Sequence, residues 1–451
     1  MLQILHYTSM IYYSIGIRLL FIGFFNNSEM LKLMNTQVPK IDKLAGIECY
    51  CTDYKGICGS IKHSNEQFRV SEIIDASFLA NISSVQDNHH KYPLYVLEKK
   101  NLDSNHAIFE IRRDLGIKLK VIGLKDAKAV TKQYASSEQT KNILKEAKTA
   151  HTLLTLKGFT KTPIGKSSLF GNTFTITIHN PVLSDISLFL PEIKKIANFY
   201  GLQRFGSERM VTHLVGKEIV KRNFQKAVEL LLSYTTEYDS TMSIELRKKS
   251  RDPKKYSQII RELPKRMDIE YKVMSALEKG KGPITALRSI PINIRRLFVQ
   301  AYQAYIFNKS LSVAVINGEN VLESKEGDLC FEIENSSVFG RIRKYNSSTD
   351  LNSQTVPAIR LIGYTFQPGK GRFDTITEKI MNIEGVTPRE FYIKEMQELS
   401  AQGGFRQAPL WCKDFEFKGS LTVSFKLPKG SYATTLLREL MKPEDPIRAG
   451  F

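Results

Sequence analysis

The stretch "VIGLKDAKAVTKQYAS", Val121–Ser136, places one carboxylate, Asp126, among lysines. Gly123 and Lys125 predict a tight loop after a strand, a common position for functional residues. Lys125 and Lys128 would favour the ionised carboxylate, which can act as a nucleophile or a base. The alternative is that Asp126 caps a helix formed by "AKAVTKQ". The local sequence alone favours the cap, because one Asp in a loop is a weak signal.

The chain has 451 residues, a length that favours two domains. Its 65 Lys and Arg against 46 Asp and Glu give a net charge of +19. Nucleic acid is the usual reason for such a surplus, because contacts to phosphates dominate its affinity for proteins. An anionic membrane surface is the competing explanation.

The five cysteines form no Cys-x-x-Cys motif and are odd in number, so neither a disulfide framework nor a zinc site is indicated. Free thiols in a reducing compartment are expected, and with them a cytoplasmic location. The first 25 residues are apolar, yet Arg18 interrupts them and no signal-peptide pattern is present. A membrane anchor is one interpretation. An extension upstream of a working start at Met30 or Met34 is favoured over it.

Alternating and helical patterns divide the rest of the chain. Strands are expected at Phe68–Ser71, Tyr92–Lys100 and Phe170–Pro181, and a helix carrying Ile108, Ile111 and Leu115 is expected to end at Gly116. Residues 185–207 predict a helix followed by a Gly-bounded loop, residues 211–311 a helical region, and residues 318–370 mixed structure. A strand pair, a turn and a helix are expected to close the chain. These patterns predict an α+β domain interrupted by a large insertion.

The most basic part of the helical region is Arg247–Arg266. Its positive charges would bind RNA phosphates if nucleic acid is the partner. The alternative is a solvated helix face, which is what most runs of charge are.

Several stretches, in order, resemble the TruD family of RNA pseudouridine synthases. They are Gly123–Gln133 ("GLKDAKAVTKQ"), Ile61–Ile73 ("IKHSNEQFRVSEI"), Phe170–Phe174 ("FGNTF"), Asn198–Gly206 ("NFYGLQRFG"), Ala301–Asn308 ("AYQAYIFN") and Leu427–Leu440 ("LPKGSYATTLLREL"). The resemblance runs from about residue 37 to the end of the sequence. It departs at Asn65–Gln67, where the family usually has Pro-Glu-Asp, and at Ala127, where a basic residue is common.

The resemblance implies an α+β fold. A pseudouridine-synthase catalytic core, with a mixed and largely antiparallel sheet, would be interrupted by a large, mostly helical α+β insertion domain. The catalytic domain would comprise residues 37–206 and 396–451, and the insertion residues 207–395. Residues 1–36 would be an extension outside the fold.

The resemblance also implies the chemistry. Pseudouridine formation breaks the N1–C1′ bond of a uridine, and the base rejoins the ribose through C5. The family uses one Asp and neither cofactor nor metal, so Asp126 is the expected nucleophile, attacking C1′ of the ribose or C6 of the uracil. A fixed cation nearby would favour the ionised Asp. Lys62 is the candidate, and an ordinary surface lysine is its alternative.

Further site residues follow from the matched motifs. Phe174 would stack on the flipped base, or be a core residue of its strand. Asn172 would hydrogen-bond to Asp126 or to the uracil, or serve a turn. Lys125 would tune Asp126 or hold a phosphate. Gln203 and Arg204 would bond to backbone or RNA, and Arg406 would face the cleft or lie on the surface.

The expected substrate is tRNA, with uridine 13 as the family precedent and other structured RNA as an alternative. The expected protein is a monomer in the cytoplasm without a membrane partner. A non-catalytic RNA-binding protein on the same scaffold is the alternative function.

Overall fold

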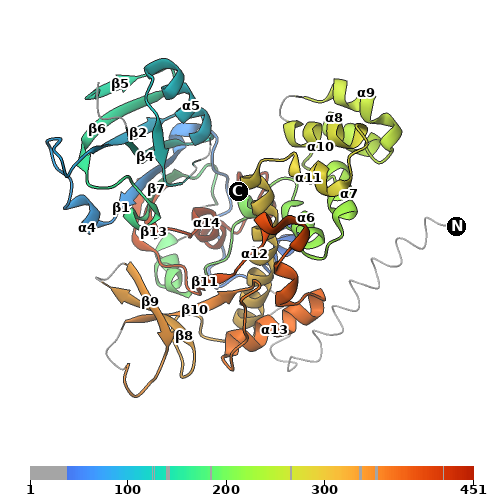
Figure 1. Ribbon diagram of the computed structural model, residues 1–451. Coiled ribbons are helices and arrows are strands. Elements are labelled where there is room, and N and C mark those ends of the chain that lie inside the picture. The colour runs from blue at the N-terminus through green and yellow to red at the C-terminus, as the bar shows by residue number, and fades with distance from the viewer. Residues whose placement is uncertain are drawn as a thin grey trace. The chain divides into compact units, whose positions relative to one another are not determined.

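The computed structural model describes residues 38–123, 125, 127–138, 143–182, 185–264, 267–334, 338–350, 354–419 and 421–451. The extension at residues 1–36 and the expected nucleophile Asp126 lie outside these ranges, as do Lys265 and Arg266 of the basic segment. The described residues form an α+β fold with two sheets and a large set of helices (Figure 1).

The larger sheet has nine strands in the order β12-β13-β7-β1-β4-β2-β6-β5, with β3 added against β4. Among the described strands, β1 and β4 are the one parallel pair, so the sheet is mixed and largely antiparallel, as expected. The strands are β1 (Phe68–Ile74), β2 (Tyr92–Lys99), β3 (Leu119–Val121), β4 (Val130–Ser137), β5 (Glu146–Lys148), β6 (Thr152–Thr160), β7 (Leu169–Thr177), β12 (Lys413–Lys418) and β13 (Thr422–Pro428).

The period-two patterns correctly predicted β1, β2 and β7. In β1 the side chains of Phe68, Val70, Glu72 and Ile74 are buried, and the residues between them are more exposed. The strand pair expected near the end of the sequence is also present, since β13 pairs with both β12 and β7. Residues more than 240 positions apart, such as Ile176 and Val423, are therefore neighbours in one sheet.

The helices lie mainly between residues 211 and 316, as the apolar spacing predicted. The α-helices are α3 (Lys40–Leu44), α4 (Ala76–Leu79), α5 (Ser104–Leu115), α6 (Thr212–Val220), α7 (Phe224–Ser233), α8 (Thr241–Lys249), α9 (Tyr256–Glu262), α10 (Asp268–Glu278), α11 (Pro283–Arg288), α12 (Ile292–Ile316), α13 (Arg372–Glu384) and α14 (Ala433–Met441). The 3-10 helices are η1 (Asn65–Gln67), η2 (Lys166–Ser168), η3 (Ile186–Lys195), η4 (Leu202–Phe205), η5 (Pro253–Lys255), η7 (Pro388–Phe391) and η8 (Lys394–Leu399).

Local sequence signals correctly predicted the end of helix α5 but not the type of helix after residue 185. Helix α5 ends at Gly116, whose φ of 68° is left-handed, and its residues Ala107 and Ile111 pack against the large sheet. The helix expected after residue 185 is instead the 3-10 segment η3. Pro191 lies inside it and has no N–H to donate to a regular α-helical hydrogen bond.

Helix α12 joins two hydrophobic cores. Ala301, Ala304 and Phe307 belong to the core formed with β1, β7, β13 and α14. Phe298 and Tyr302 belong to the core formed with α6, α7, α10 and α13. The helix runs between these groups in Figure 1 and packs along α6.

A four-stranded sheet completes the fold, in the order β11-β10-β8-β9. Its strands are β8 (Leu329–Glu334), β9 (Val338–Lys344), β10 (Thr355–Leu361) and β11 (Gly404–Gln407). The expected mixed structure of residues 318–370 is thus present, and β11 joins it from a later part of the chain. Among the described residues, no helix has the length and apolar character needed to span a bilayer.

The packing of α6 on α12 gives a first prediction. A Cβ added to Gly216 of α6 would lie 1.9 Å from the carbonyl oxygen of Phe298 on α12. Helix propensity alone would make Gly216→Ala stabilising by about 1 kcal/mol. We expect overpacking to reverse that sign and to lower the free energy of unfolding by about 1–3 kcal/mol.

Urea unfolding measures this change. Gly404→Ala is the control, because an added Cβ there meets no atom within 4 Å. A Gly216→Ala protein as stable as wild type would show that α6 and α12 are less closely packed than described.

Candidate active site

In the loop between β3 and β4, buried polar groups hold Gly123 and Lys125, which precede Asp126 in the sequence. The Lys125 backbone N–H donates to Ser104 Oγ at 2.9 Å, and that hydroxyl donates to Gln133 Oε1 at 2.8 Å. Gln133 Nε2 in turn donates to the Gly123 carbonyl at 3.3 Å. These bonds tie the loop to the start of α5 and to β4.

The segment after Asp126 is not a helix. Residues 127–129 are irregular, and β4 begins at Val130 and pairs with β1, β2 and β3. The alternative that Asp126 caps a helix formed by "AKAVTKQ" is therefore wrong. The β-branched pair Val130–Thr131 lies in the sheet, where such side chains pack well.

Lys125 is an internal anchor of this loop. Its ammonium lies 3.0 Å from Glu72 Oε1 and donates to Asn172 Oδ1 at 2.9 Å. Glu72 and Asn172 face each other across β1 and β7. The Glu72 side chain is 0% exposed and that of Lys125 is 11% exposed, so the ion pair is buried. Of the two expected roles for Lys125, holding a phosphate finds no support in this position.

A cavity of about 590 Å³ opens beside the loop. Two residues predicted from the sequence, Lys62 and Gln203, line it together with Ala127 and Lys128, which follow Asp126 in the chain. The other lining residues are Ile61, His63, Ser207, Glu208, Ile447, Arg448, Gly450 and Phe451. The structure thus brings four separate stretches of sequence to one cavity, and one of these stretches directly follows the expected nucleophile in the chain.

Two residues of the cavity wall have strained backbones. Lys62 has a φ of 62° and Ser207 a φ of 42°, a region that costs about 1–3 kcal/mol for a residue with a side chain. Such conformations cluster at functional sites. The Lys62 ammonium lies 5.0 Å from the centre of the Phe68 ring, a cation–π contact that orients it at the cavity.

Gln203 and Arg204 lie on η4, which ends at the left-handed Gly206. Gln203 accepts a hydrogen bond from Thr434 Oγ1 at 3.1 Å and still lines the cavity. Arg204 donates to the Tyr432 hydroxyl at 3.1 Å. Phe205 is buried, as expected, with its ring edge-on to His213.

Phe174 is a core residue in this structure. Its side chain is 7% exposed, and its ring stacks on Phe425 with centroids 5.4 Å apart. A base-stacking platform must present a ring face to the substrate. The position therefore favours the core alternative for Phe174, which the alternation of β7 had left open.

The expectation that Arg406 faces the cleft or the surface needs correction. The residue is 5% exposed, and its guanidinium donates to the carbonyls of Asn198 and Gly430 at 3.0 and 2.6 Å. It also donates to the Asn198 side chain at 3.0 Å and lies over the Tyr200 ring. Burial lowers the pKa of Arg406. The five donors of a guanidinium suit this internal role, because they satisfy several carbonyls at once.

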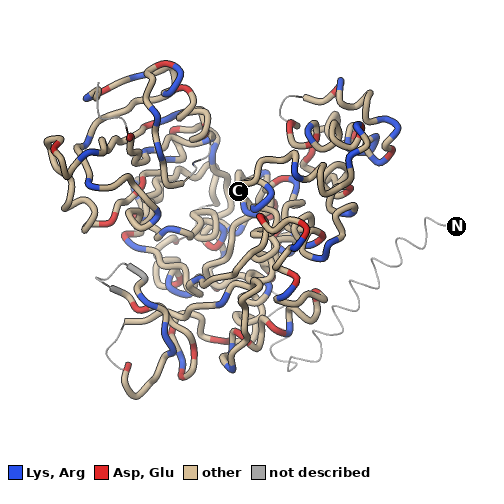
Figure 2. Tube along the Cα trace, in the orientation of Figure 1, with Lys and Arg blue, Asp and Glu red and all other residues tan. Residues whose placement is uncertain are grey.

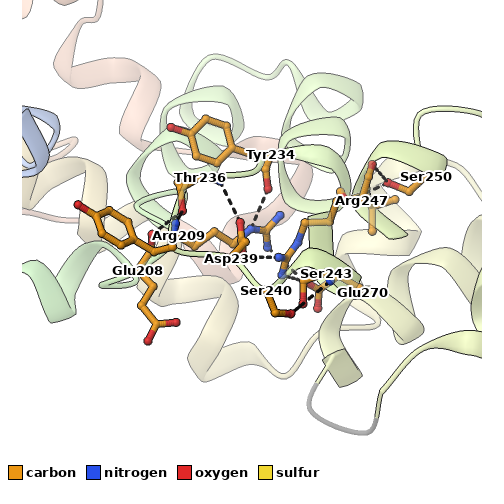
Figure 3. Close-up of polar contacts among 12 residues, drawn as sticks. Glu208, Arg209, Tyr234, Thr236, Asp239, Ser240, Ser243, Arg247, Ser250 and Glu270 are labelled. Atoms are coloured by element: carbon orange, nitrogen blue, oxygen red, sulfur yellow. Dashed lines mark hydrogen bonds and ion pairs between the residues drawn. The ribbon is translucent and has the colours of Figure 1, made fainter. Parts of the chain in front are cut away.

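The basic segment after Arg247 divides into buried and exposed parts. Arg247 contacts Asp239 and lies 3.0 Å from Glu270 Oε1, an oxygen that Arg209 also approaches at 3.2 Å (Figure 3). Burial and the neighbouring Arg247 lower the pKa of Arg209 to about 10. Arg247 therefore holds helices together and does not face solvent.

Other charged residues of this segment lie at the surface. Lys248, Arg251 and Lys254 are exposed. Lys249 of α8 pairs with Glu262 of α9 at 3.4 Å, and basic and acidic residues lie close together in this part of the protein (Figure 2). Both interpretations of the segment, phosphate contact and solvated face, apply to these exposed residues only.

Sequence reasoning placed Glu72 in the matched stretch Ile61–Ile73 but gave it no role, and it missed the lining residues Ser207, Glu208 and Arg448. A signal for Glu72 was present, because it continues the inward phase set by Phe68 and Val70 in the β1 pattern. A carboxylate on that phase must find a cation, and Lys125 is that cation. Within the described part of the chain, no group of three or more His, Cys, Asp or Glu residues is arranged to hold a metal ion.

Comparison with known proteins confirms the family resemblance seen in the sequence motifs. Residues 44–440 match the model of the family described as tRNA pseudouridine synthase D (TruD). The chain belongs to the TruD family of pseudouridine synthases, which are isomerases.

Similar proteins cover almost the whole sequence. A probable tRNA pseudouridine synthase D of Pyrobaculum islandicum is 32% identical over 92% of this chain and 100% of its own length. One from Archaeoglobus fulgidus is 31% identical over 90% and 100%. The crystal structure of a putative tRNA pseudouridine synthase D from Methanosarcina mazei superposes with a TM-score of 0.71 at 28% identity, covering 91% of this chain and 100% of the other.

The buried pair of Lys125 and Glu72 gives a second prediction. Lys125→Met leaves the Glu72 carboxylate buried without its cation, so the free energy of unfolding should fall by about 3–5 kcal/mol. Adding Glu72→Gln removes the stranded charge and should restore a large part of that loss. A double-mutant cycle from urea unfolding measures the coupling between the two positions.

Lys132→Met is the matched control, because Lys132 pairs with Glu98 at an exposed position. It should cost about 1 kcal/mol or less. Simple additivity of the Lys125 and Glu72 changes would contradict the buried ion pair.

Proposed function

We propose that the protein isomerises a uridine of tRNA, uridine 13, to pseudouridine, with Asp126 as nucleophile and without a cofactor. One observation carries this proposal. The cavity beside the β3–β4 loop is lined by Lys62, Gln203 and the residues that follow Asp126, all from motifs of the TruD family. The names of the relatives supply the tRNA substrate.

The reaction needs no external reactant. The Asp126 carboxylate adds to C1′ or to C6, and the N1–C1′ bond of the uridine breaks. After the base has turned, C5 bonds to C1′, the bond to the Asp126 carboxylate breaks, the hydrogen on C5 leaves as a proton, and N1 gains a proton. Uridine and pseudouridine are isomers, so atoms and electrons balance within the RNA and water.

The described residues support distinct parts of this mechanism. Lys62 and Lys128 place positive charge at the cavity, where it favours an ionised carboxylate and attracts phosphates. The Asn172 amide oxygen accepts a hydrogen bond from the Lys125 ammonium, and Asn172 thereby helps Lys125 to hold the loop. Gln203 and Arg204 lie on η4, and Gln203 is the one that reaches the cavity. Phe174 and Arg406 support the site from inside the protein.

The proposal extends to the domain plan and the cellular setting. Residues 37–206 and 396–451 form the catalytic domain, and residues 207–395 are an insertion that carries α6 to α13. The sharing of one sheet by β7 and β13 supports this division. The protein acts as a monomer in the cytoplasm, where its five cysteines, all unpaired, would stay reduced. A non-catalytic RNA-binding protein on this scaffold is the second candidate, and activity decides between the two.

Release of tritium from tRNA carrying [5-³H]uridine tests the nucleophile. Asp126→Asn should lower the rate roughly a thousandfold or more, because an amide cannot form the covalent intermediate. Asp114→Asn, at an exposed aspartate of α5 that pairs with Arg113, is the control and should keep the wild-type rate.

A transcript with cytidine at position 13 tests the target uridine and should release no tritium. Equal release by wild type and Asp126→Asn would exclude the nucleophile assignment. Absence of release by wild type, with RNA binding retained, would favour the non-catalytic protein.

Charge reversal at Lys248 tests the exposed part of the basic segment. Lys248→Glu should weaken tRNA binding several-fold and reduce the slope of log K against log salt by about 1, if the side chain neutralises a phosphate. Filter binding at several KCl concentrations measures the slope. Lys394→Glu, an exposed lysine of η8, is the control. An unchanged slope for Lys248→Glu would identify α8 as a solvated face.

A further inference from the structure

The segment Asp445–Phe451 forms one wall of the cavity, although it lies outside residues 44–440 that match the family model. Phe451 is buried in the core beneath the large sheet. Gly450 has a φ of 92°, and a Cβ there would lie 2.3 Å from the Ile61 carbonyl. The Ile61 N–H donates to Ala449 at 2.9 Å. The segment is therefore docked on the residue that precedes Lys62.

The same segment presents a positive charge at the cavity. Its backbone closes on itself through Ala449 N–H to Asp445 and Phe451 N–H to Pro446, at 3.0 and 2.9 Å. Arg448 projects from this turn, with its side chain 76% exposed. Asp445 accepts from the Arg448 backbone at 3.1 Å and lies 3.3 Å from its Nε. These contacts position the guanidinium and leave most of it open to solvent.

The helical region holds Asp445 from the other side. The Tyr238 hydroxyl hydrogen-bonds to the Asp445 carboxylate, and burial together with that carboxylate raises the pKa of Tyr238 to about 12. The next residue, Asp239, belongs to the ion-pair network of Arg247 and Glu270 in Figure 3. The turn that carries Arg448 is thus held from one side by Ile61 and from the other by Tyr238, which precedes α8.

We propose that Arg448 is a substrate-binding residue that contacts a backbone phosphate of the RNA at the mouth of this cavity. The inference rests on the proposed function, because it takes RNA as the ligand. Lys62, Lys128 and Arg448 line the cavity, and Glu208 is the one acidic side chain among its described lining residues. An exposed guanidinium held at a fixed position matches the geometry of a phosphate, which it can bind through two hydrogen bonds.

A purely structural role does not account for Arg448. Its ion pair with Asp445 is largely exposed, and such pairs contribute little to stability. The docking of the segment depends instead on Gly450, on Phe451 and on the backbone bond to Ile61. Replacing Arg448 should therefore leave folding intact and change only what the cavity binds.

Binding of an unmodified tRNA transcript to the full chain tests the inference. Arg448→Ala should raise Kd about five- to tenfold and reduce the salt slope by about 0.7–1. Arg448→Lys should keep the wild-type slope, because the cation remains. Asp445→Asn should also keep it, although it removes the ion pair. Arg113→Ala is the matched control, since Arg113 is an exposed arginine paired with its neighbour Asp114.

Activity and stability separate this inference from the proposed function. Arg448→Ala should raise KM for tRNA with kcat and thermal midpoint unchanged. A wild-type salt slope for Arg448→Ala, or an equal loss in Arg113→Ala, would overturn the role of Arg448 even in an active enzyme. A reduced slope in Arg448→Ala would support it even if wild type released no tritium, in which case only the proposed function fails. Absence of RNA binding by wild type would overturn both.

Discussion

Helix α12 is buried against two hydrophobic cores at once, and the arrangement of the segments at the candidate active site depends on it. A helix in that position can expose few polar groups, so those that it carries must find partners inside the protein. Asn308 shows how this is done. Its amide donates to the carbonyls of Ala45 and Tyr200 at 2.9 and 3.0 Å, and its oxygen accepts from the Tyr200 N–H at 2.8 Å. One side chain thereby fixes the backbone that leads into η4 and the cavity.

Buried guanidinium groups extend this principle through the rest of the protein. Arg406 holds the other side of the same backbone at Asn198. Arg438 of α14 contacts Asp42 and Glu439 and donates to the Cys49 carbonyl at 3.1 Å. A buried charge without partners costs several kcal/mol, so each group constrains the segments that meet at it. The count of 65 Lys and Arg therefore overstates the basic groups at the surface, because part of the arginine content is internal.

The regular elements were predictable because their signals are local. Alternation predicted β1 and β7, and glycine in a left-handed position predicted the end of α5. The environments of Phe174 and Arg406, by contrast, are set by distant parts of the chain. The interiors that receive Phe174 and Arg406 are completed by Phe425 and Gly430, more than 20 residues away in each case. A contact between residues so far apart in the chain leaves no local pattern in a single sequence.

The loop at Asp126 shows the same division between local and distant information. Its lysines look equivalent in the sequence, yet their side chains have different surroundings in the structure. The positive charge of Lys125 is compensated by Glu72 inside the protein, so it is not presented to the cavity. Lys62 and Lys128 remain at the cavity.

Two unit charges 4 Å apart interact by about 1 kcal/mol in water and about 4 kcal/mol near a protein surface. An RNA that covers this cavity would exclude water and strengthen the attraction between these lysines and a carboxylate. The same docking would bring phosphates that compete for the lysines. A separate cation for the phosphates, such as Arg448, would let substrate bind without removing the charge that favours ionisation of the proposed nucleophile, Asp126.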